Sequence, residues 1–331
     1  MYMNMCNLFV HNILPVYKQL TNTSGFYRHY QHLYKVNKNF ISWLLFVILS
    51  LVWGSSFILM KIGLNNHLTA YQIAAIRIAA AGLVLLPVAL RFIKKISLRQ
   101  LLLIVLSGAL GSLIPAFLFC IAEQGIDSAL AGALNSLTPI FVIITGAVFF
   151  NSKTASNKIL GIIVAFTGSV LLLLSKGDIQ QGQHIIYVLL VILATLLYGF
   201  NVNMVLKHLI HIPSLHIAAI ALAINGLFAF IILIFTGYFS LPLGDAGIIK
   251  ATVAAVTLGI AGTAAATVLF YMLVKRAGAI FASMVTYGIP FVAIAWGFYF
   301  GEQVGWKQLG ALLVILLGVY LANKRTNKLD A

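Results

Sequence analysis

The chain has 331 residues, of which 62% are hydrophobic and only 8% charged, and its mean hydropathy is +1.04. Soluble domains carry about 25% charged residues, so this composition excludes a soluble globular protein and indicates an integral membrane protein with several spans. The formal charge of +15 does not indicate a nucleic-acid partner, because the Lys and Arg residues form short clusters between apolar runs, as in cytoplasmic loops.

The first forty residues differ in composition from the rest of the chain. They are polar, rich in Tyr, His and Asn, and contain four basic residues but no acidic one. They lack an apolar core of signal-peptide length followed by a small-residue cleavage site. We interpret residues 1–40 either as a cytoplasmic tail or as the product of an over-extended gene start.

Ten stretches beyond this tail are apolar and long enough to cross a membrane, which takes about 20 residues of helix. They predict an all-α integral membrane protein with ten transmembrane helices, arranged as two inverted five-helix repeats. The predicted spans are 41–62, 71–92, 100–122, 128–150, 158–175, 184–206, 214–237, 248–272, 279–300 and 306–323. The predicted domains are the tail at 1–40, a first repeat at 41–178, a second repeat at 179–323 and a basic cytoplasmic C-terminus at 324–331.

Charges on the connecting segments predict the orientation. With the N-terminus inside the cell, the predicted cytoplasmic segments hold 16 of the 21 Lys and Arg residues. All but one of the six acidic residues then fall on the opposite side: Glu123, Asp127, Asp178, Asp245 and Glu302. Because basic residues are enriched in cytoplasmic loops, both termini are predicted to be cytoplasmic.

The stretch 73–82, IAAIRIAAAG, returns 144 residues later as IAAIALAING at 217–226, with six of ten positions identical. Other pairs match in the same order along the chain: Trp53-Gly54 with Tyr198-Gly199, and the segment around Pro139 with that around Pro290. Because each copy contains five helices, the second is inverted in the membrane. Inverted repeats are a recurrent transporter design in which two halves rock about a central substrate. A duplication retained in a membrane enzyme is the alternative.

The stretch LVWGSSFILMKIGL at 51–64, the arginine in the second helix and the prolines of helices 4 and 9 resemble the EamA-type branch of the drug/metabolite transporter superfamily. The resemblance covers residues 41–323. It implies two EamA domains and the export or exchange of small metabolites, amino acids or drugs. Gly301-Glu302 follows the family's acidic turn before the closing helix, whereas the first repeat departs from this pattern with Asn151.

Arg77 is the clearest charge inside a predicted span. Ionisable residues within a membrane are costly and by default indicate a functional site. If Arg77 faces a cavity, its planar set of donors suits a carboxylate or phosphate on the substrate. The alternative is that Arg77 extends to the interface or pairs with Glu123 or Asp127.

Further candidates for substrate binding come from the first helix of each repeat. Trp53 and Ser56 lie near the middle of helix 1, where a tryptophan is unusual because it favours interfaces. Lys61 ends that helix, either as an interfacial anchor or as an extracellular gate or substrate contact. Tyr198 and Asn201 occupy the equivalent stretch of helix 6. Asn201 is one of two asparagines two residues apart, so at most one of them is expected to meet substrate.

Pro139 and Pro290 lie inside predicted helices 4 and 9, at matching places in the two repeats. Each removes the hydrogen bond of a carbonyl four residues earlier, which is tolerated where a neighbour or cavity water satisfies that carbonyl. We predict hinge or cavity-lining roles for both segments, with passive kinks as the alternative. Neighbouring candidates for substrate contact are Asn135, Tyr287 and Trp296.

The leading hypothesis is a secondary active transporter of the bacterial inner membrane, a monomer or homodimer, that works by alternating access. The sequence has no phosphate-binding loop of the GxxxxGK[ST] type, and we expect no cofactor, metal or catalytic residue. Energy is then expected from a gradient or from counter-exchange, and Glu123 is the candidate for proton coupling. The alternatives are an obligate metabolite or nucleotide-sugar antiporter, an intramembrane enzyme, and a membrane sensor or scaffold without transport.

Overall fold

The computed structural model describes residues 24–126, 128–175, 185–299 and 305–324. The chain forms two compact units, residues 1–44 and 45–331. The described part of the first unit is helical, and everything that follows concerns the second unit. Some residues singled out in the sequence lie outside the described residues: Asp127, Asp178, Gly301 and Glu302.

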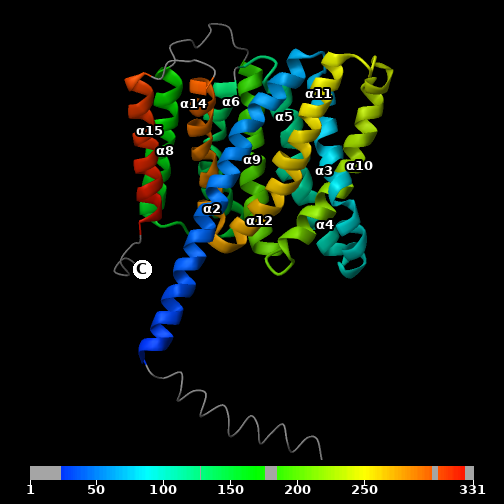
Figure 1. The fold of residues 1–331 in the computed structure, drawn as a ribbon. Helices are drawn as coiled ribbons and strands as arrows, with labels where there is room; N and C mark the ends of the chain where they lie inside the picture. The colour runs from blue at the N-terminus through cyan, green and yellow to red at the C-terminus, as the bar shows by residue number, and fades with distance from the viewer. Residues whose placement is uncertain (1–23, 127, 176–184, 300–304, 325–331) are drawn as a thin grey trace, which may run out of the picture. The chain divides into compact units, whose positions relative to one another are not determined.

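Five helical segments follow one another in each repeat (Figure 1). The first repeat contains α2 (Ser24–Asn65), α3 (Ala70–Phe92) with η1 (Ile93–Lys95), α4 (Leu98–Gly108) with η2 (Ala109–Leu113) and α5 (Ile114–Ala122), α6 (Ser128–Asn135) with α7 (Thr138–Phe150), and α8 (Ser156–Ser175). The second contains α9 (Ile185–His208), α10 (Ser214–Phe235) with η3 (Tyr238–Ser240), α11 (Ala246–Thr257) with η4 (Leu258–Ala265) and α12 (Ala266–Ala277), α13 (Ala279–Ser283) with η5 (Met284–Gly288) and α14 (Ile289–Tyr299), and α15 (Trp306–Asn323).

Nine helical stretches among the described residues are long and apolar enough to cross a membrane, and α8 adds a shorter apolar stretch at 156–172. The predicted all-α membrane fold is therefore confirmed. Local sequence fixes where several of these helices begin. Thr69 and Gln72 form a capping box at the start of α3, and Ser97 with Gln100 forms another at the start of α4.

Two helices in each repeat are interrupted at matching places. The third helix contains a π-helical segment, η2 in the first repeat and η4 in the second. The fourth helix, predicted as one continuous span, is instead broken between α6 and α7 and between α13 and α14. Pro139 and Pro290 consequently occupy the second residue of a new helix, where the missing N–H costs no helical hydrogen bond.

The two repeats meet most extensively along α3 and α10, which carry the two copies of the repeated stretch. Gly82 and Gly226, the final residues of the copies, face each other there. A Cβ on Gly82 would lie 2.5 Å from the Leu222 carbonyl oxygen and 3.0 Å from the Gly226 Cα. Small residues allow membrane helices to approach this closely and to gain packing energy without a hydrophobic driving force.

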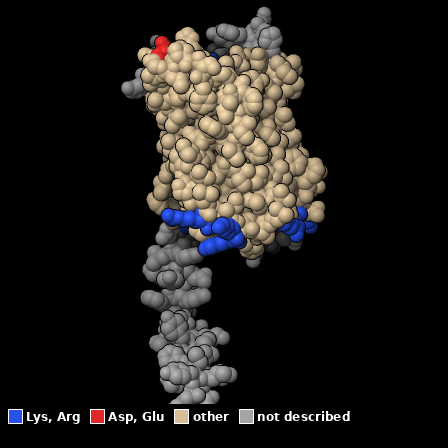
Figure 2. All heavy atoms as spheres, turned by 90° about the vertical axis from the view of Figure 1, so that its right-hand side faces the viewer, with Lys and Arg blue, Asp and Glu red and all other residues tan. Residues whose placement is uncertain are grey.

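Basic side chains gather at one end of the helices, and an acidic side chain lies at the other, on the face drawn in Figure 2. We call the first the basic end. Its residues are on the α3–α4 connection and at the ends of α9 and α12: Arg91, Lys94, Lys95, Arg99, Lys207, Lys275 and Arg276. Glu123 follows α5 and Asp245 precedes α11, so both lie at the opposite end.

The close approach of α3 and α10 predicts that Gly82→Ala destabilises the protein. The added methyl group meets a backbone carbonyl that has no freedom to move aside, and overpacking of this kind costs about 1–3 kcal/mol. We expect a melting temperature several degrees lower in detergent, measured by intrinsic fluorescence. Gly310→Ala is the matched control, because no heavy atom lies within 4 Å of a Cβ at that exposed helical position. Equal melting temperatures for the two variants would contradict the proposed role of the contact.

Candidate functional site

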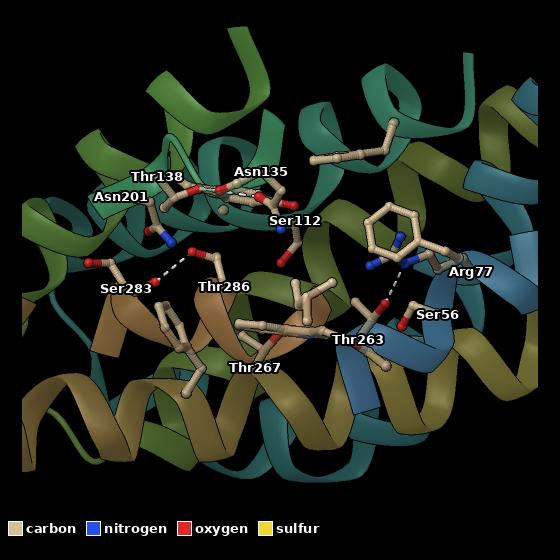
Figure 3. A pocket seen from close by; sticks show the side chains of 18 of the residues that line it. Ser56, Arg77, Ser112, Asn135, Thr138, Asn201, Thr263, Thr267, Ser283 and Thr286 are labelled. Atoms are coloured by element: carbon tan, nitrogen blue, oxygen red, sulfur yellow. Dashed lines mark hydrogen bonds between the residues drawn. The ribbon is translucent and has the colours of Figure 1, made fainter. Parts of the chain in front are cut away.

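A cavity of about 90 Å³ lies between the two repeats. Its polar lining, drawn in Figure 3, consists of Ser56, Arg77, Ser112, Asn135, Thr138, Asn201, Thr263, Thr267, Ser283 and Thr286. Its aromatic lining consists of Trp53, Phe57, Phe119, Tyr198, Phe270 and Tyr271. Both repeats contribute to each set, as expected for a transporter site at a repeat interface.

The π-helical segments bring matching residues to the cavity. The sequence is GALGS at 108–112, at the junction of α4 and η2, and GIAGT at 259–263 in η4, so two glycines and a hydroxyl residue recur in the same order. Ser112 and Thr263 both line the cavity. A π-helical turn inserts one extra residue and is frequent at functional sites. The two segments therefore place one hydroxyl group from each repeat at the cavity.

The broken fourth helices supply the next part of the wall. Asn135 ends α6, and the Thr138 hydroxyl at the start of α7 donates to its carbonyl oxygen at 2.8 Å. The Thr286 hydroxyl likewise donates to the Ser283 carbonyl oxygen at 3.0 Å. Short side chains thus satisfy carbonyls that the helix breaks release, and irregular backbone is tolerated in a membrane where it lines a cavity.

Arg77 is the only charged residue among the described residues that line the cavity. Its Nε donates to the Thr263 hydroxyl oxygen at 2.7 Å. Within the described part of the chain, no protein group accepts a hydrogen bond from its two terminal nitrogens, and no carboxylate forms an ion pair with it. A partly buried guanidinium with unused donors is suited to bind an anionic ligand group.

The cavity has two chemically different ends (Figure 3). Arg77 lies with Ser56 and Thr263 at one end, whereas neutral amides and hydroxyls lie at the other: Asn135, Thr138, Asn201, Ser283 and Thr286. Aromatic rings complete the wall. The Trp53 ring lies 5.1 Å from that of Phe270, and its Nε1 donates to the Gly262 carbonyl oxygen at 3.1 Å.

A buried network holds Asn201 in place. Ser107 Oγ donates to Asn201 Oδ1 at 2.6 Å and lies 2.9 Å from Tyr271 Oη. Asn201 Nδ2 donates to the same tyrosine oxygen at 3.4 Å. The network joins α4, α9 and α12, so the cavity wall depends on contacts between the two repeats.

The residues predicted from the sequence divide into two groups. The cavity is lined by Trp53, Ser56, Arg77, Asn135, Tyr198 and Asn201. Lys61, Tyr287 and Trp296 do not line it. The Tyr287 hydroxyl donates to the Ile162 carbonyl oxygen on α8, and Trp296 Nε1 donates to Ser55 Oγ, so these side chains join helices instead. Lys61 is exposed near the end of α2.

Sequence reasoning missed the hydroxyl groups of the third helices. Ser112, Thr263 and Thr267 line the cavity, but serines and threonines are also common in packed membrane helices. The signal that was available is the repeated G-x-x-G followed by a hydroxyl residue.

Glu123 lies one turn beyond the cavity wall, at the end of α5. It is 2% exposed, and neither carboxylate oxygen has a hydrogen-bond partner among the described residues. Burial raises the pKa of the Glu123 carboxyl to about 8, and the positive charges of Lys61 and Arg77 oppose the rise by favouring the charged form. Burial therefore favours the protonated form of this carboxyl.

Among the described residues, nine membrane-length apolar helices and the shorter α8 form two repeats around a polar cavity, an arrangement typical of transporters built from inverted repeats. The EamA-like transporter family matches residues 41–174 and 185–324, and the chain belongs to that family.

Curated relatives are similar to the chain over different lengths. A probable amino-acid metabolite efflux pump of Escherichia coli is 28% identical over 42% of this chain, and one of Salmonella typhimurium is 31% identical over 42%. These matches span only 44% of each relative's length. Protein PagO of Salmonella typhimurium is 23% identical over 84% of this chain and 91% of its own. A solved crystal structure with 14% identity has the same fold, with a TM-score of 0.65 over 85% of this chain and 97% of that one.

The network around Asn201 predicts that Ser107→Ala destabilises the protein. Two buried polar groups lose their shared partner, which costs about 1–3 kcal/mol. We expect a lower melting temperature and weaker protection by any bound substrate. Thr167→Ala serves as the control, because that exposed hydroxyl bonds only to the Ile163 carbonyl of its own helix. A Ser107→Ala protein as stable as the Thr167→Ala protein would refute the network's role.

Proposed function

We propose that the protein is a secondary active transporter that exports or exchanges small metabolites by alternating access. The observation that carries the proposal is Arg77, whose terminal nitrogens have no hydrogen-bond partner among the described residues and which lines a cavity between the two repeats. The similarity to relatives named as probable amino-acid metabolite efflux pumps supports export and a substrate of amino-acid type.

The chemistry of the cavity favours a small substrate with a carboxylate at one end. Arg77 binds the carboxylate in a planar, two-pronged arrangement, and the aromatic rings of Trp53 and Phe270 pack against its carbon chain. Amides and hydroxyls at the far end accept or donate hydrogen bonds to a second polar group. Because no acidic residue is found among the described lining residues, a purely cationic substrate lacks a counter-charge.

The two repeats supply the moving parts. In the proposed cycle, the halves rock about the α3–α10 contact, and the helix breaks before Pro139 and Pro290 act as hinges next to the cavity. The concentration of Lys and Arg at the basic end supports placing that end in the cytoplasm, with both termini inside and the protein in the bacterial inner membrane.

Coupling to protons is proposed to occur through Glu123. The carboxyl is buried, has no hydrogen-bond partner among the described residues, and feels the charges of Lys61 and Arg77, so its protonation changes when that environment changes. Obligate exchange against a counter-substrate is the competing mechanism. A sensor or scaffold that binds the same ligand without moving it is the competing function outside transport.

Replacing Arg77 by Gln tests the substrate site. We expect the variant, in proteoliposomes loaded with a panel of radiolabelled amino acids and their N-acetyl derivatives, to lose at least about 30-fold in apparent affinity for carboxylate substrates. This loss corresponds to removing one partner of a buried charged pair, about 2 kcal/mol or more. Arg77→Lys should recover part of the affinity, because it keeps the charge but loses the Nε bond to Thr263.

Arg91→Gln is the matched control, since Arg91 is exposed at the basic end of the same helix. Equal substrate flux in the Arg77→Gln and Arg91→Gln proteins would show that Arg77 does not bind the substrate. Substrate-dependent melting shifts without flux in the wild-type protein would indicate a sensor.

Replacing Glu123 by Gln tests proton coupling. With its pKa raised to about 8, the wild-type carboxyl is mostly protonated when it is open to a compartment at about pH 7 and mostly deprotonated when it is open to one at about pH 9. We expect a gradient between these two pH values to drive substrate accumulation in the wild-type protein. Glu123→Gln should retain exchange at equal pH but lose the response to the gradient, and Asp245→Asn should behave as the wild type. An unchanged gradient response in Glu123→Gln would favour counter-exchange.

A further inference from the structure

A second hollow, of about 390 Å³, lies at the basic end. It is bounded by the end of α7 with the loop to α8, the end of α9, and the turn between α12 and α13. Asn151 in the left-handed conformation (φ 53°) and Gly278 with φ 89° form the turns on two of its sides. We call this hollow the basic vestibule.

Three lysines surround the vestibule: Lys153, Lys158 and Lys207. None of its described lining residues is acidic, and none of the three lysines forms a salt bridge within the described part of the chain. Lys207 is held by its Nζ, which donates to the Phe150 carbonyl oxygen at 3.3 Å and lies 5.6 Å above the Phe150 ring. Like charges around a concave surface focus the electric field and concentrate anions.

The vestibule and the central cavity lie along the same three helical segments. On α7, Thr138 lines the cavity and Val142 the vestibule; on α9, Asn201 lines the cavity and Asn203 the vestibule. The same holds for neighbouring residues on α13. About one helical turn of α7 therefore separates the two spaces, which is a thin barrier for a gate.

Hydrogen bonds of the Asn203 side chain hold the two helices of this barrier together. Its Nδ2 shares two N–H groups among three acceptors: the Val142 carbonyl oxygen at 2.8 Å, Thr145 Oγ1 at 3.0 Å and the Gly199 carbonyl oxygen at 2.9 Å. The side chain is 5% exposed. It therefore joins α7 to α9 at the level between the vestibule and the cavity.

We propose that the basic vestibule is a loading site for substrates with a net negative charge, from which they pass the barrier at Asn203 to reach Arg77. The inference rests on the proposed function and narrows the substrate class to organic anions carrying a carboxylate. It also gives the direction of loading, from the basic end. The lysines raise the local concentration of the anion, and Arg77 binds it.

The test replaces Lys153, Lys158 and Lys207 together by Gln. In phosphatidylcholine vesicles at low salt, we expect the KM of the wild-type protein to be lower for N-acetyl amino acids, which are net anions, than for the parent zwitterions. The triple variant should raise the KM for the anions about tenfold, with Vmax unchanged, and high salt should remove the difference. A second triple variant, Lys94→Gln, Lys95→Gln and Arg99→Gln, removes the same charge elsewhere at the basic end and should leave the KM unchanged.

Equal KM values in the two triple variants would overturn the proposal that the basic vestibule is a loading site, while leaving the proposed function intact. A KM effect that appears only when phosphatidylglycerol is present would assign the lysines to a lipid headgroup and would also overturn it.

Thiol labelling, which does not depend on transport, tests the proposed loading site separately from the proposed function. Ser152→Cys, in a background with Cys6 and Cys120 replaced by Ala, places a thiol in the vestibule wall. Its reaction with an anionic methanethiosulfonate, relative to a cationic one, should fall about tenfold when the three lysines are replaced. If no carboxylate is transported by the wild type, the proposed function fails. If replacing the three lysines leaves the ratio of the anionic to the cationic reaction rate unchanged, the proposed loading site is refuted.

Discussion

The glycine contact between α3 and α10 is the constraint on which the rest of the structure depends. Gly82 and Gly226 let the two copies of the repeated stretch approach until their backbones touch. The third helices pack against this pair in matching ways. A Cβ on Gly108 would lie 3.1 Å from the Ala221 carbonyl oxygen, and one on Gly259 would meet the Arg77 carbonyl oxygen. The π-helical segments and their hydroxyls are thereby placed against the same central pair.

Arg77 breaks this symmetry. It occupies the position in the first copy that Ala221 occupies in the second, so matching backbone contacts support different side chains. A neutral partner, the Thr263 hydroxyl, orients the guanidinium without neutralising it. A carboxylate in place of that hydroxyl would instead form a buried ion pair with the guanidinium and neutralise its charge. The charge at the described lining of the cavity therefore comes from one position at which the two copies differ.

Composition, hydropathy and the internal repeat predicted the class of fold because apolar length and duplication are properties of the sequence itself. The cavity was predicted in part. Arg77 and Trp53 are residues that a membrane span rarely contains, and both line the cavity. Tyr287 and Trp296 were candidates because they lie near Pro290, but they join neighbouring helices, since an aromatic side chain with one polar atom serves packing as well as binding. Side-chain direction, which separates the two cases, depends on the helix breaks and the π-helical turns.

The π-helical segments have a consequence for how the chain can vary. Each contains one residue more than a regular α-helix needs over the same length. Deleting one residue from GALGS or GIAGT would restore a regular helix and leave the parts on either side of the deletion in nearly the same relative orientation. The packing of those flanking parts would then be kept, whereas Ser112 or Thr263 would lose the position at the cavity that the wide turn gives it. The extra residue in each turn is therefore needed for the cavity and not for the path of the helix through the membrane.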